Sequence, residues 1–328
     1  MTLHISEAEV RAVLTMPMAI EAVEENSRKQ ATGDVVVHPR RRFELPGGGF
    51  FHYMAAADFS AGYIAMKQYT FVKGELKFLV PLYEMKSGDL VALIEADYMG
   101  QLRTGAASGV ATKYLARQNC RVAAIIGTGG QAHTQLEAIV HVRKIESVRA
   151  FGRNASKRET FAKEMSERLG IPVESAATSG DAVRGADIVC TATTSANPVI
   201  SGADLAPGVH INAIGANHAH KRELDEDAVK SADVIVVDSI EQSRQEAGDL
   251  IIAFQGDEIC WTGVKKLSDV VSGKVSGRTS ESEVTLFKSN GIASWDLAAA
   301  MKVYALAKEK NLGRELPLWG SGALSQTR

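Results

Sequence analysis

Hydrophobic positions follow two spacings along the first hundred residues, and each predicts a different kind of structure. Ser6 and Glu9 form a capping-box pattern, and apolar residues follow at helical spacing over 10–18, which predicts a helix from about residue 7. Between about residues 35 and 100, short apolar stretches are separated by turn signals such as Pro-Gly-Gly-Gly at 46–49. This second pattern predicts an antiparallel sheet.

From residue 121 onward, strand-like and helix-like patterns alternate. Such alternation is typical of a parallel sheet covered by helices on both faces. Residues 104–117 are rich in small side chains and predict a helix that packs closely on its neighbours. A helical run at 292–309 is expected to cross back onto the first part of the chain. Strands are predicted at 122–126, 147–151, 187–192, 210–214 and 233–238, and helices at 130–142 and 156–169.

Length and composition narrow the classes of protein that fit these patterns. A chain of 328 residues is long enough for two domains. The formal net charge of −2 argues against a nucleic-acid partner, and no apolar run approaches the length of a membrane span. Cys120, Cys190 and Cys260 are odd in number and widely spaced, so neither a disulfide framework nor a metal site is predicted. We expect a cytoplasmic protein that binds neither nucleic acid nor membrane.

The most informative motif is a glycine-rich turn between the predicted strand 122–126 and the helix that follows it. Glycines at such a turn allow a close approach of the backbone to a dinucleotide pyrophosphate, and the helix N-terminus offers N–H groups and a positive dipole end. The motif predicts a nicotinamide cofactor. The expected cofactor-binding residues of this turn are Gly127, Thr128, Gly129, Gly130, Gln131 and Ala132.

The choice between NAD and NADP is predicted from the end of the second strand of the same unit. NAD-preferring proteins usually carry an acidic residue there, but residues 147–158 contain four basic side chains and no carboxylate. This composition favours the 2′-phosphate of NADP, with Arg153, Asn154 and Lys157 as the candidate contacts. The alternative is a solvated helix start whose charges face water, in which case NAD is possible.

Four separated motifs resemble the ornithine cyclodeaminase/mu-crystallin family. The segments 103–116, 127–132, 210–216 with 222–224, and 287–292 followed by Asp296 occur in the family's order. The resemblance covers nearly the whole chain and implies an α/β fold with a Rossmann-type doubly wound parallel sheet plus an α+β substrate and dimerisation domain. It also implies a homodimer. The implied domains are residues 1–118 with 292–328, and residues 119–291.

The resemblance also implies a substrate site made of Arg41, Lys67 and Arg103, with Met54 lining the pocket. Such cations can hold the carboxylate of an amino or imino acid by charge-assisted hydrogen bonds. Structural alternatives stay open for each residue. Arg41 fits a surface arginine, and its register against Arg40 and Arg42 in the basic triplet is open. Lys67 fits a solvent-facing strand lysine, and Arg103 fits the start of a helix, where a cation opposes the helix dipole.

One position departs from the deaminating members of the family, which carry an Asp where this chain has Asn217. An amide cannot accept a proton, which disfavours ornithine cyclodeamination and alanine dehydrogenation. Water, Lys67 or a nearby histidine, His218 or His220, could supply a proton to an imine, and Asp296 fits either a functional carboxylate or a helix cap.

The favoured hypothesis from the sequence is an NADPH-preferring reductase of a small α-imino acid such as Δ1-pyrroline-2-carboxylate. The first alternative is an ornithine cyclodeaminase or an alanine dehydrogenase-like enzyme. The second is a crystallin-like protein that binds the cofactor without catalysis.

Overall fold

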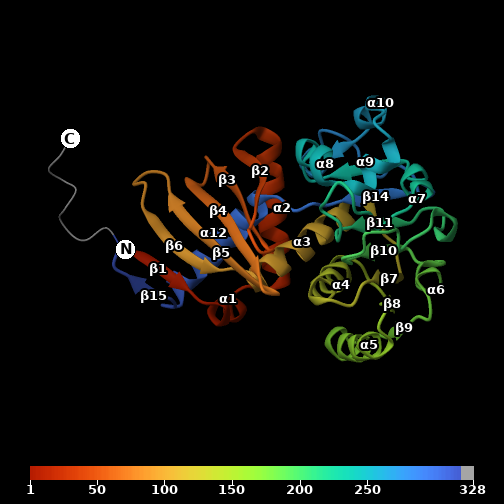
Figure 1. The fold of residues 1–328 in the computed structure, drawn as a ribbon, viewed down its shortest axis with the longest axis horizontal. Coiled ribbons are helices and arrows are strands. Elements are labelled where there is room, and N and C mark those ends of the chain that lie inside the picture. The colour runs from red at the N-terminus through yellow and green to blue at the C-terminus, as the bar shows by residue number, and fades with distance from the viewer. Residues whose placement is uncertain (319–328) are drawn as a thin grey trace.

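The computed structural model describes residues 1–318, which fold around two β-sheets (Figure 1). Figure 1 shows the sheets at opposite ends of the long axis, with helix α3 (Asp97–Leu115) running between them. The chain has the predicted α/β fold, with a parallel Rossmann-like sheet and a second, mixed sheet. The end of the predicted first domain, residues 319–328, lies outside the described residues.

The first sheet has seven strands in the order β15-β1-β6-β5-β4-β3-β2 and is antiparallel except for the β1–β6 pair. The antiparallel sheet predicted between residues 35 and 100 is therefore confirmed. Its strands are β1 (Thr2–Ile5), β2 (Val35–Glu44), β3 (Phe50–Asp58), β4 (Tyr63–Val72), β5 (Glu75–Glu84), β6 (Leu90–Glu95) and β15 (Arg314–Leu316).

Three helices accompany this sheet: α1 (Glu7–Val13), α2 (Met16–Thr32) and α12 (Ala293–Glu309). The capping box at the start of α1 is present as predicted. The predicted first helix is nevertheless interrupted after Val13, because Pro17 in the first turn of α2 has no N–H for a continuous helix. Helix α12 packs against α2, β3 and β4, so the last helix does cross back onto the first sheet.

The second sheet has eight parallel strands in the order β13-β12-β14-β11-β10-β7-β8-β9. The strands predicted from residue 121 onward are all present, within two residues at each end. They are β7 (Val122–Ile126), β8 (Ser147–Phe151), β9 (Val173–Ser175), β10 (Ile188–Thr191), β11 (His210–Ala213), β12 (Val234–Val237), β13 (Lys265–Lys266) and β14 (Thr285–Lys288). The helices of this unit are α4 (Gly130–Val142), α5 (Ala155–Leu169), α6 (Ser179–Val183), α7 (Glu226–Lys230), α8 (Ile240–Glu246), α9 (Gly248–Phe254), α10 (Glu258–Thr262) and α11 (Leu267–Val271), with the short 3-10 helix η1 (Gly202–Asp204).

Helix α3 joins the two units through small residues, as its composition predicts. A Cβ on Gly105 would lie 2.3 Å from the carbonyl oxygen of Thr134 on α4. Only glycine permits this approach of two helix backbones. The helix begins at Asp97, where the Glu7 carboxylate accepts backbone N–H groups from Asp97 and Tyr98. Within residues 1–318, no helix is long and apolar enough to cross a bilayer.

Candidate active site

A cavity of about 460 Å³ lies between the two sheets and is lined by residues from both. Its second-sheet walls include the segments that follow β7 and β10, at the point where the strand order of the parallel sheet reverses. Open α/β sheets bind their ligands at this position. We call it the central cavity. Its lining includes seven of the residues predicted from the sequence: Met54, Lys67, Arg103, Gly129, Gly130, Gln131 and Asn217.

The turn after β7 leaves room for a phosphate-bearing ligand. Gly127 has a φ of 109°, and a Cβ there would lie 2.4 Å from the carbonyl oxygen of Ala192. Gly129 is the N-cap of α4, and a Cβ at this position would meet nothing within 4 Å. The N–H groups of the first helical turn have no intrahelical partner. The glycine turn therefore fits a dinucleotide pyrophosphate. Ala132 is buried in the core behind it.

The end of β8 presents basic side chains to solvent. Arg153, Asn154 and Lys157 are all exposed. The Asn154 side chain caps α5 by accepting the backbone N–H of Lys157 at 2.9 Å, so its amide has a structural role. Lys157 and Thr128 line a separate shallow cavity of about 220 Å³, beside the glycine turn. The basic side chains thus lie where the ribose end of a dinucleotide would extend from that turn.

The opposite end of the central cavity holds a buried cluster of charges. Lys67 on β4 and Arg103 on α3 both bond to one oxygen of Asp296, in the first turn of α12, at 3.0 Å each. All three side chains are at least 94 % buried. We call them the Lys67–Arg103–Asp296 cluster. The solvent-facing alternative for Lys67 is thus excluded, and Asp296 is not the N-cap of its helix, because Ile292 takes that position.

This cluster carries an excess positive charge, since two cations share a single carboxylate. Nη1 of Arg103 is buried and has no partner among the described residues. A buried guanidinium nitrogen without an acceptor is costly, so an acidic ligand would satisfy it. Burial, followed by the positive charge of Arg103, lowers the pKa of Lys67 from 10.5 to about 8. A negative ligand would stabilise the ammonium form.

The helix-start interpretation of Arg103 is wrong, because the residue lies in the second turn of α3 rather than at its first position. The start of α3 is not visible in the local sequence, because the N-cap residue is Ala96, whose side chain cannot cap a helix. Glu7 supplies the cap from another helix instead. Arg103 therefore points into the cluster from the helix body.

The structure places the early arginine differently from the sequence-based prediction. Arg41 pairs with Tyr53 in the β2–β3 register, on the outer face of the sheet, and is exposed. An irregularity between His38 and Arg41 shifts the alternation of β2, so that Arg40 and Arg42 line the cavity instead. A one-residue change of register moves a side chain to the opposite face.

Arg40 acts across the boundary between the two units. Its Nη1 donates to the Glu246 carboxylate at 2.7 Å, and its Nη2 donates to the carbonyl oxygens of Asn290 and Gly291 at 2.7 and 3.3 Å. Asp238 accepts the backbone N–H groups of Asn290 and Gly291 at 2.7 Å each. Arg40 and Asp238 therefore both bind the backbone of the segment that leads into α12, the helix that carries the buried Asp296.

Asn217 lies in the loop after β11, and buried charged side chains hold the backbone of this loop in place. Lys288 donates to the carbonyl oxygen of Ala216 at 2.5 Å and pairs with Asp249 at 2.9 Å. Glu223 accepts the N–H groups of Gly215 and Thr193 at 2.7 Å each, which ties this loop to the one after β10. The Asn217 amide lines the central cavity.

The two histidines near Asn217 differ in position. His218 lines the central cavity, whereas His220 is exposed and does not. Nε2 of His218 lies 2.6 Å from Nη2 of Arg42, so it accepts a hydrogen bond from the guanidinium. Burial and the charge of Arg42 lower the pKa of His218 to about 4. His218 is therefore neutral near pH 7 and is a poor proton source.

Sequence reasoning missed His52 and Tyr69, which line the central cavity, and it chose Arg41 from the basic triplet where Arg40 and Arg42 line the cavity. The period of two along a strand could have found His52 and Tyr69. His52 shares a sheet face with Met54, and Tyr69 shares one with Lys67. The sequence analysis includes Glu223 only within the motif at 222–224. Its contacts with the loops after β10 and β11 depend on the tertiary fold.

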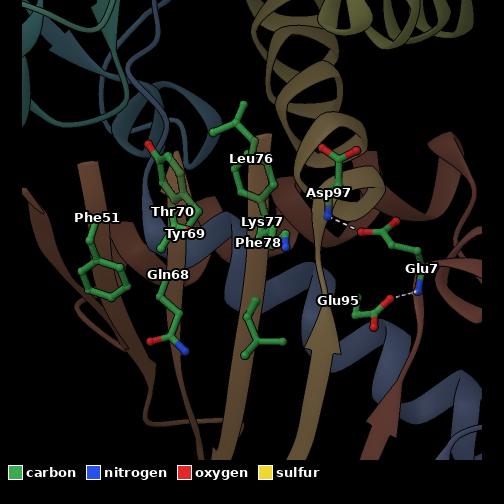
Figure 2. A pocket seen from close by; sticks show the side chains of 11 residues that line it. Glu7, Phe51, Gln68, Tyr69, Thr70, Leu76, Lys77, Phe78, Glu95 and Asp97 are labelled. Carbon is green, nitrogen blue, oxygen red and sulfur yellow. Dashed lines mark hydrogen bonds between the residues drawn. The ribbon is translucent and has the colours of Figure 1, made fainter. Parts of the chain in front are cut away.

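A second cavity, of about 520 Å³, extends over the outer face of the first sheet (Figure 2). Figure 2 shows Phe51, Gln68 and Thr70 on the neighbouring strands and the hydrogen bonds of Glu7 to Asp97 and Glu95 at the edge. No part of the glycine turn or of the Lys67–Arg103–Asp296 cluster lines this cavity. We therefore place the chemistry in the central cavity.

Comparisons with known proteins find similarity along nearly the whole chain. The sequence model of the ornithine cyclodeaminase/mu-crystallin family matches residues 2–311. A Δ1-pyrroline-2-carboxylate reductase of Bacillus cereus is 38 % identical over 249 residues, which cover 74 % of this chain and 75 % of the relative.

Two solved structures are similar over nearly the whole chain. The Thermococcus litoralis Δ1-pyrroline-2-carboxylate reductase, in complex with NADH and L-proline, has a TM-score of 0.92 and 34 % identity, covering 96 % of this chain and 100 % of that one. An archaeal alanine dehydrogenase dimer with bound NAD has a TM-score of 0.91 and 34 % identity, covering 97 % and 99 %.

Proposed function

Because this chain belongs to the ornithine cyclodeaminase/mu-crystallin family, we propose that it is an NAD(P)H-dependent reductase of a small cyclic α-imino acid such as Δ1-pyrroline-2-carboxylate. The observation that carries the proposal is the Lys67–Arg103–Asp296 cluster, whose excess positive charge and unpartnered guanidinium nitrogen face a cavity shared with the glycine turn. One carboxylate would neutralise the cluster and satisfy Arg103.

The residues around the glycine turn would hold the cofactor. When bound, a dihydronicotinamide supplies a hydride to the imine carbon. The chain's own residues bind and orient the substrate for this transfer. Arg103 and Lys67 grip the carboxylate, and Met54 provides an apolar wall beside them. Holding the reacting carbon in place lowers the entropic part of the barrier.

Lys67 is the proton source that fits best. Its pKa of about 8 lies close to neutral pH, where a general acid is most effective. Reduction of an imine needs one proton on nitrogen, and the ammonium can donate it and recover it from water. Neutral His218 accepts a hydrogen bond from Arg42 and is less suited to this role.

The cofactor preference is proposed to be NADP(H), with NAD(H) as a possible substitute. Arg153 and Lys157 are exposed near the end of β8, and the segment from 147 to 158 carries no carboxylate that would repel a 2′-phosphate. Asn154 would contribute through its cap of α5, which orders this segment. The solved neighbours named above contain NADH or NAD, so a nicotinamide cofactor is supported independently of the phosphate.

A second candidate is an amino-acid dehydrogenase, which the similarity to an archaeal alanine dehydrogenase favours. In amine oxidation, Lys67 could take back the proton that it gives in reduction. Deamination also requires water to add to the imine and ammonia to leave, and these steps need a further proton acceptor. Asn217, where deaminating members of the family carry Asp, lines the cavity with an amide that cannot accept a proton. We therefore favour reduction of a preformed imine over both alanine dehydrogenation and ornithine cyclodeamination.

We further propose that the protein is a homodimer formed through the outer face of the first sheet. Phe43 is 58 % exposed there, and Val36, Ile64 and Val72 are each 40 % exposed. Large apolar side chains exposed on one sheet face are typical of an interaction surface. Light scattering during size-exclusion chromatography would test this, and a monomer at micromolar concentration would contradict it. The predicted domain boundaries and the cytoplasmic location stay predictions.

The function is tested by following NADPH or NADH oxidation with purified protein. Δ1-Pyrroline-2-carboxylate should be reduced to proline, while pyrroline without the carboxylate should not be. Ammonia release from ornithine, or NAD reduction with alanine as the better reaction, would favour the second candidate. Cofactor binding without turnover of any imino or amino acid would overturn both.

A further inference from the structure

Three neighbouring strands of the first sheet place a polar chain along the wall of the central cavity. Nε of Arg42 on β2 donates to Nε2 of His52 on β3, and Nδ1 of His52 lies 2.6 Å from the Tyr69 hydroxyl on β4. The sheet register places Arg42 opposite His52 and His52 opposite Tyr69, so the strand pairing itself fixes this order. All three side chains line the cavity.

The direction of these hydrogen bonds follows from the chemistry of the guanidinium. Arginine has only donors, so Nε2 of His52 must accept. Burial and the charge of Arg42 lower the pKa of His52 to about 3, and the ring is therefore neutral with its single proton on Nδ1. That proton is donated to Tyr69. The Tyr69 oxygen is thus an acceptor toward His52.

The Tyr69 proton is left for another partner. Among residues 1–318, the hydroxyl donates to no protein acceptor once His52 takes the donor role. The Tyr69 ring is held by stacking on Phe78, with centroids 4.9 Å apart, and by its edge contact with His52. Lys67 lies two residues before Tyr69 on the same face of β4, with Nζ 6.0 Å from the ring centroid. The hydroxyl is therefore an oriented donor next to the cation cluster.

We propose that Tyr69 donates a hydrogen bond to the carboxylate of the bound substrate and that His52, held by Arg42, is the residue that positions it. This inference rests on the proposed function, because it names a further contact in the same site. A carboxylate can accept about four hydrogen bonds, so it has room for a donor besides Arg103 and Lys67. A third donor from a different element would fix the carboxylate plane, and with it the face of the imine carbon presented to the cofactor.

The direct test is Tyr69→Phe, which removes only the hydroxyl. Loss of one hydrogen bond to a charged group should raise KM for the imino acid by about 10- to 100-fold while kcat changes little. The matched control is Tyr63→Phe, on the same strand and sheet face but outside the cavity lining, and its kinetics should be unchanged. An unchanged KM in Tyr69→Phe, or a fall in kcat alone, would overturn the contact with the carboxylate.

Two His52 variants separate positioning from packing. The amide of His52→Asn can place an N–H near the site of Nδ1, whereas that of His52→Gln reaches toward the site of Nε2 instead. We expect His52→Asn to keep a KM near that of the unaltered protein and His52→Gln to approach the KM of Tyr69→Phe. In the double variant His52→Gln/Tyr69→Phe, KM should rise no further than in Tyr69→Phe alone. Equal effects of the two amides, or additive effects in the double variant, would show that His52 acts only by packing.

A binding measurement keeps this inference separate from the proposed reaction. Pyrrole-2-carboxylate is a planar carboxylate that cannot be reduced, and its affinity for the protein with saturating NADPH can be titrated calorimetrically. Tyr69→Phe should weaken it by about 10-fold or more, and Tyr63→Phe should not. If the protein reduces no cyclic imino acid, the proposed function fails, but this titration still decides whether Tyr69 holds a carboxylate. Equal affinities in the two variants would overturn the inference.

Discussion

The two ends of the central cavity are built in opposite ways. The proposed nucleotide end depends on backbone: Gly127 and Gly129 make space, and a helix N-terminus offers the donors. The proposed substrate end depends on buried side chains, with Lys67 and Arg103 sharing the carboxylate of Asp296. The first end comes from one continuous segment, whereas the second is assembled from β4, α3 and α12.

This difference determines how each end fails. A backbone site is damaged by adding atoms, since a Cβ can clash or occupy the place of a phosphate. A side-chain site is damaged by removing one member, because the remaining buried charges lose their partner. The predictions below test this contrast.

The largest effect is expected at Arg103. Arg103→Ala removes the unpartnered donor and leaves Lys67 as the single cation on Asp296. We expect kcat/KM for the imino acid to fall by about 100- to 1000-fold, while the dissociation constant for NADPH stays the same. Steady-state kinetics and fluorescence titration of the cofactor measure the two quantities.

Arg41→Ala is the matched control for Arg103→Ala, and it also tests the register of β2. Arg41 is exposed on the outer face, so kcat/KM should change by less than about twofold. A loss of activity comparable to that of Arg103→Ala would mean that the strand register places the wrong arginine in the cavity.

At the nucleotide end, two glycines should respond differently to the same added methyl group. In Gly127→Ala, the φ of 109° and the carbonyl oxygen of Ala192 at 2.4 Å both oppose a Cβ, so we expect a lower melting temperature and a loss of cofactor affinity of about 10-fold or more. In Gly129→Ala, nothing lies within 4 Å, so stability should be retained and only cofactor affinity should fall. Thermal unfolding with and without NADPH distinguishes the two, and equal losses of stability would contradict the contrast.

The same contrast explains what the sequence could predict. Strand and helix positions from residue 121 onward followed from local periodicity, and the glycine turn is a local motif. The first helix ends early because of Pro17. This proline is visible in the sequence, but the prediction followed the apolar spacing instead. The start of α3 could not be read locally, because Glu7 caps it from a distance.

The substrate end was predicted through the family resemblance rather than from local pattern. The resemblance implies roles for Lys67 and Arg103, but the sequence does not distinguish a helix cap from a functional carboxylate at Asp296, their shared partner. These three residues lie 36 to 229 positions apart and meet only in the fold, and no spacing rule joins them. Arg41 was displaced by the irregularity in β2, a feature that alternation alone does not reveal.

A pH titration probes the substrate end further, because Lys67 there has a pKa close to neutrality. Burial and Arg103 lower the pKa of Lys67 to about 8, so its ammonium is present below that pH and is lost above it. If the ammonium holds the carboxylate and donates the proton, kcat/KM should fall about tenfold per pH unit above pH 8.

Two controls accompany this titration. Affinity for pyrrole-2-carboxylate should weaken through the same pH range, since its carboxylate does not titrate there. In Lys67→Arg, the residual activity should lose this alkaline limb, because a guanidinium stays charged. A limb that persists in Lys67→Arg would assign the ionisation to the substrate or to another residue.

The smallest effect is expected where the nucleotide end depends on exposed side chains. Arg153→Glu and Lys157→Glu reverse charges near the proposed 2′-phosphate, and exposed charges contribute little because water and salt screen them. We expect each variant to shift the ratio of kcat/KM for NADPH over NADH toward NADH by about 3- to 10-fold at low ionic strength. Lys163→Glu, an exposed charge reversal farther along α5, controls for the general change in field and should shift the ratio less. An unmoved ratio in both variants would leave the basic segment as a solvated helix start, and the cofactor end would then depend on its backbone alone.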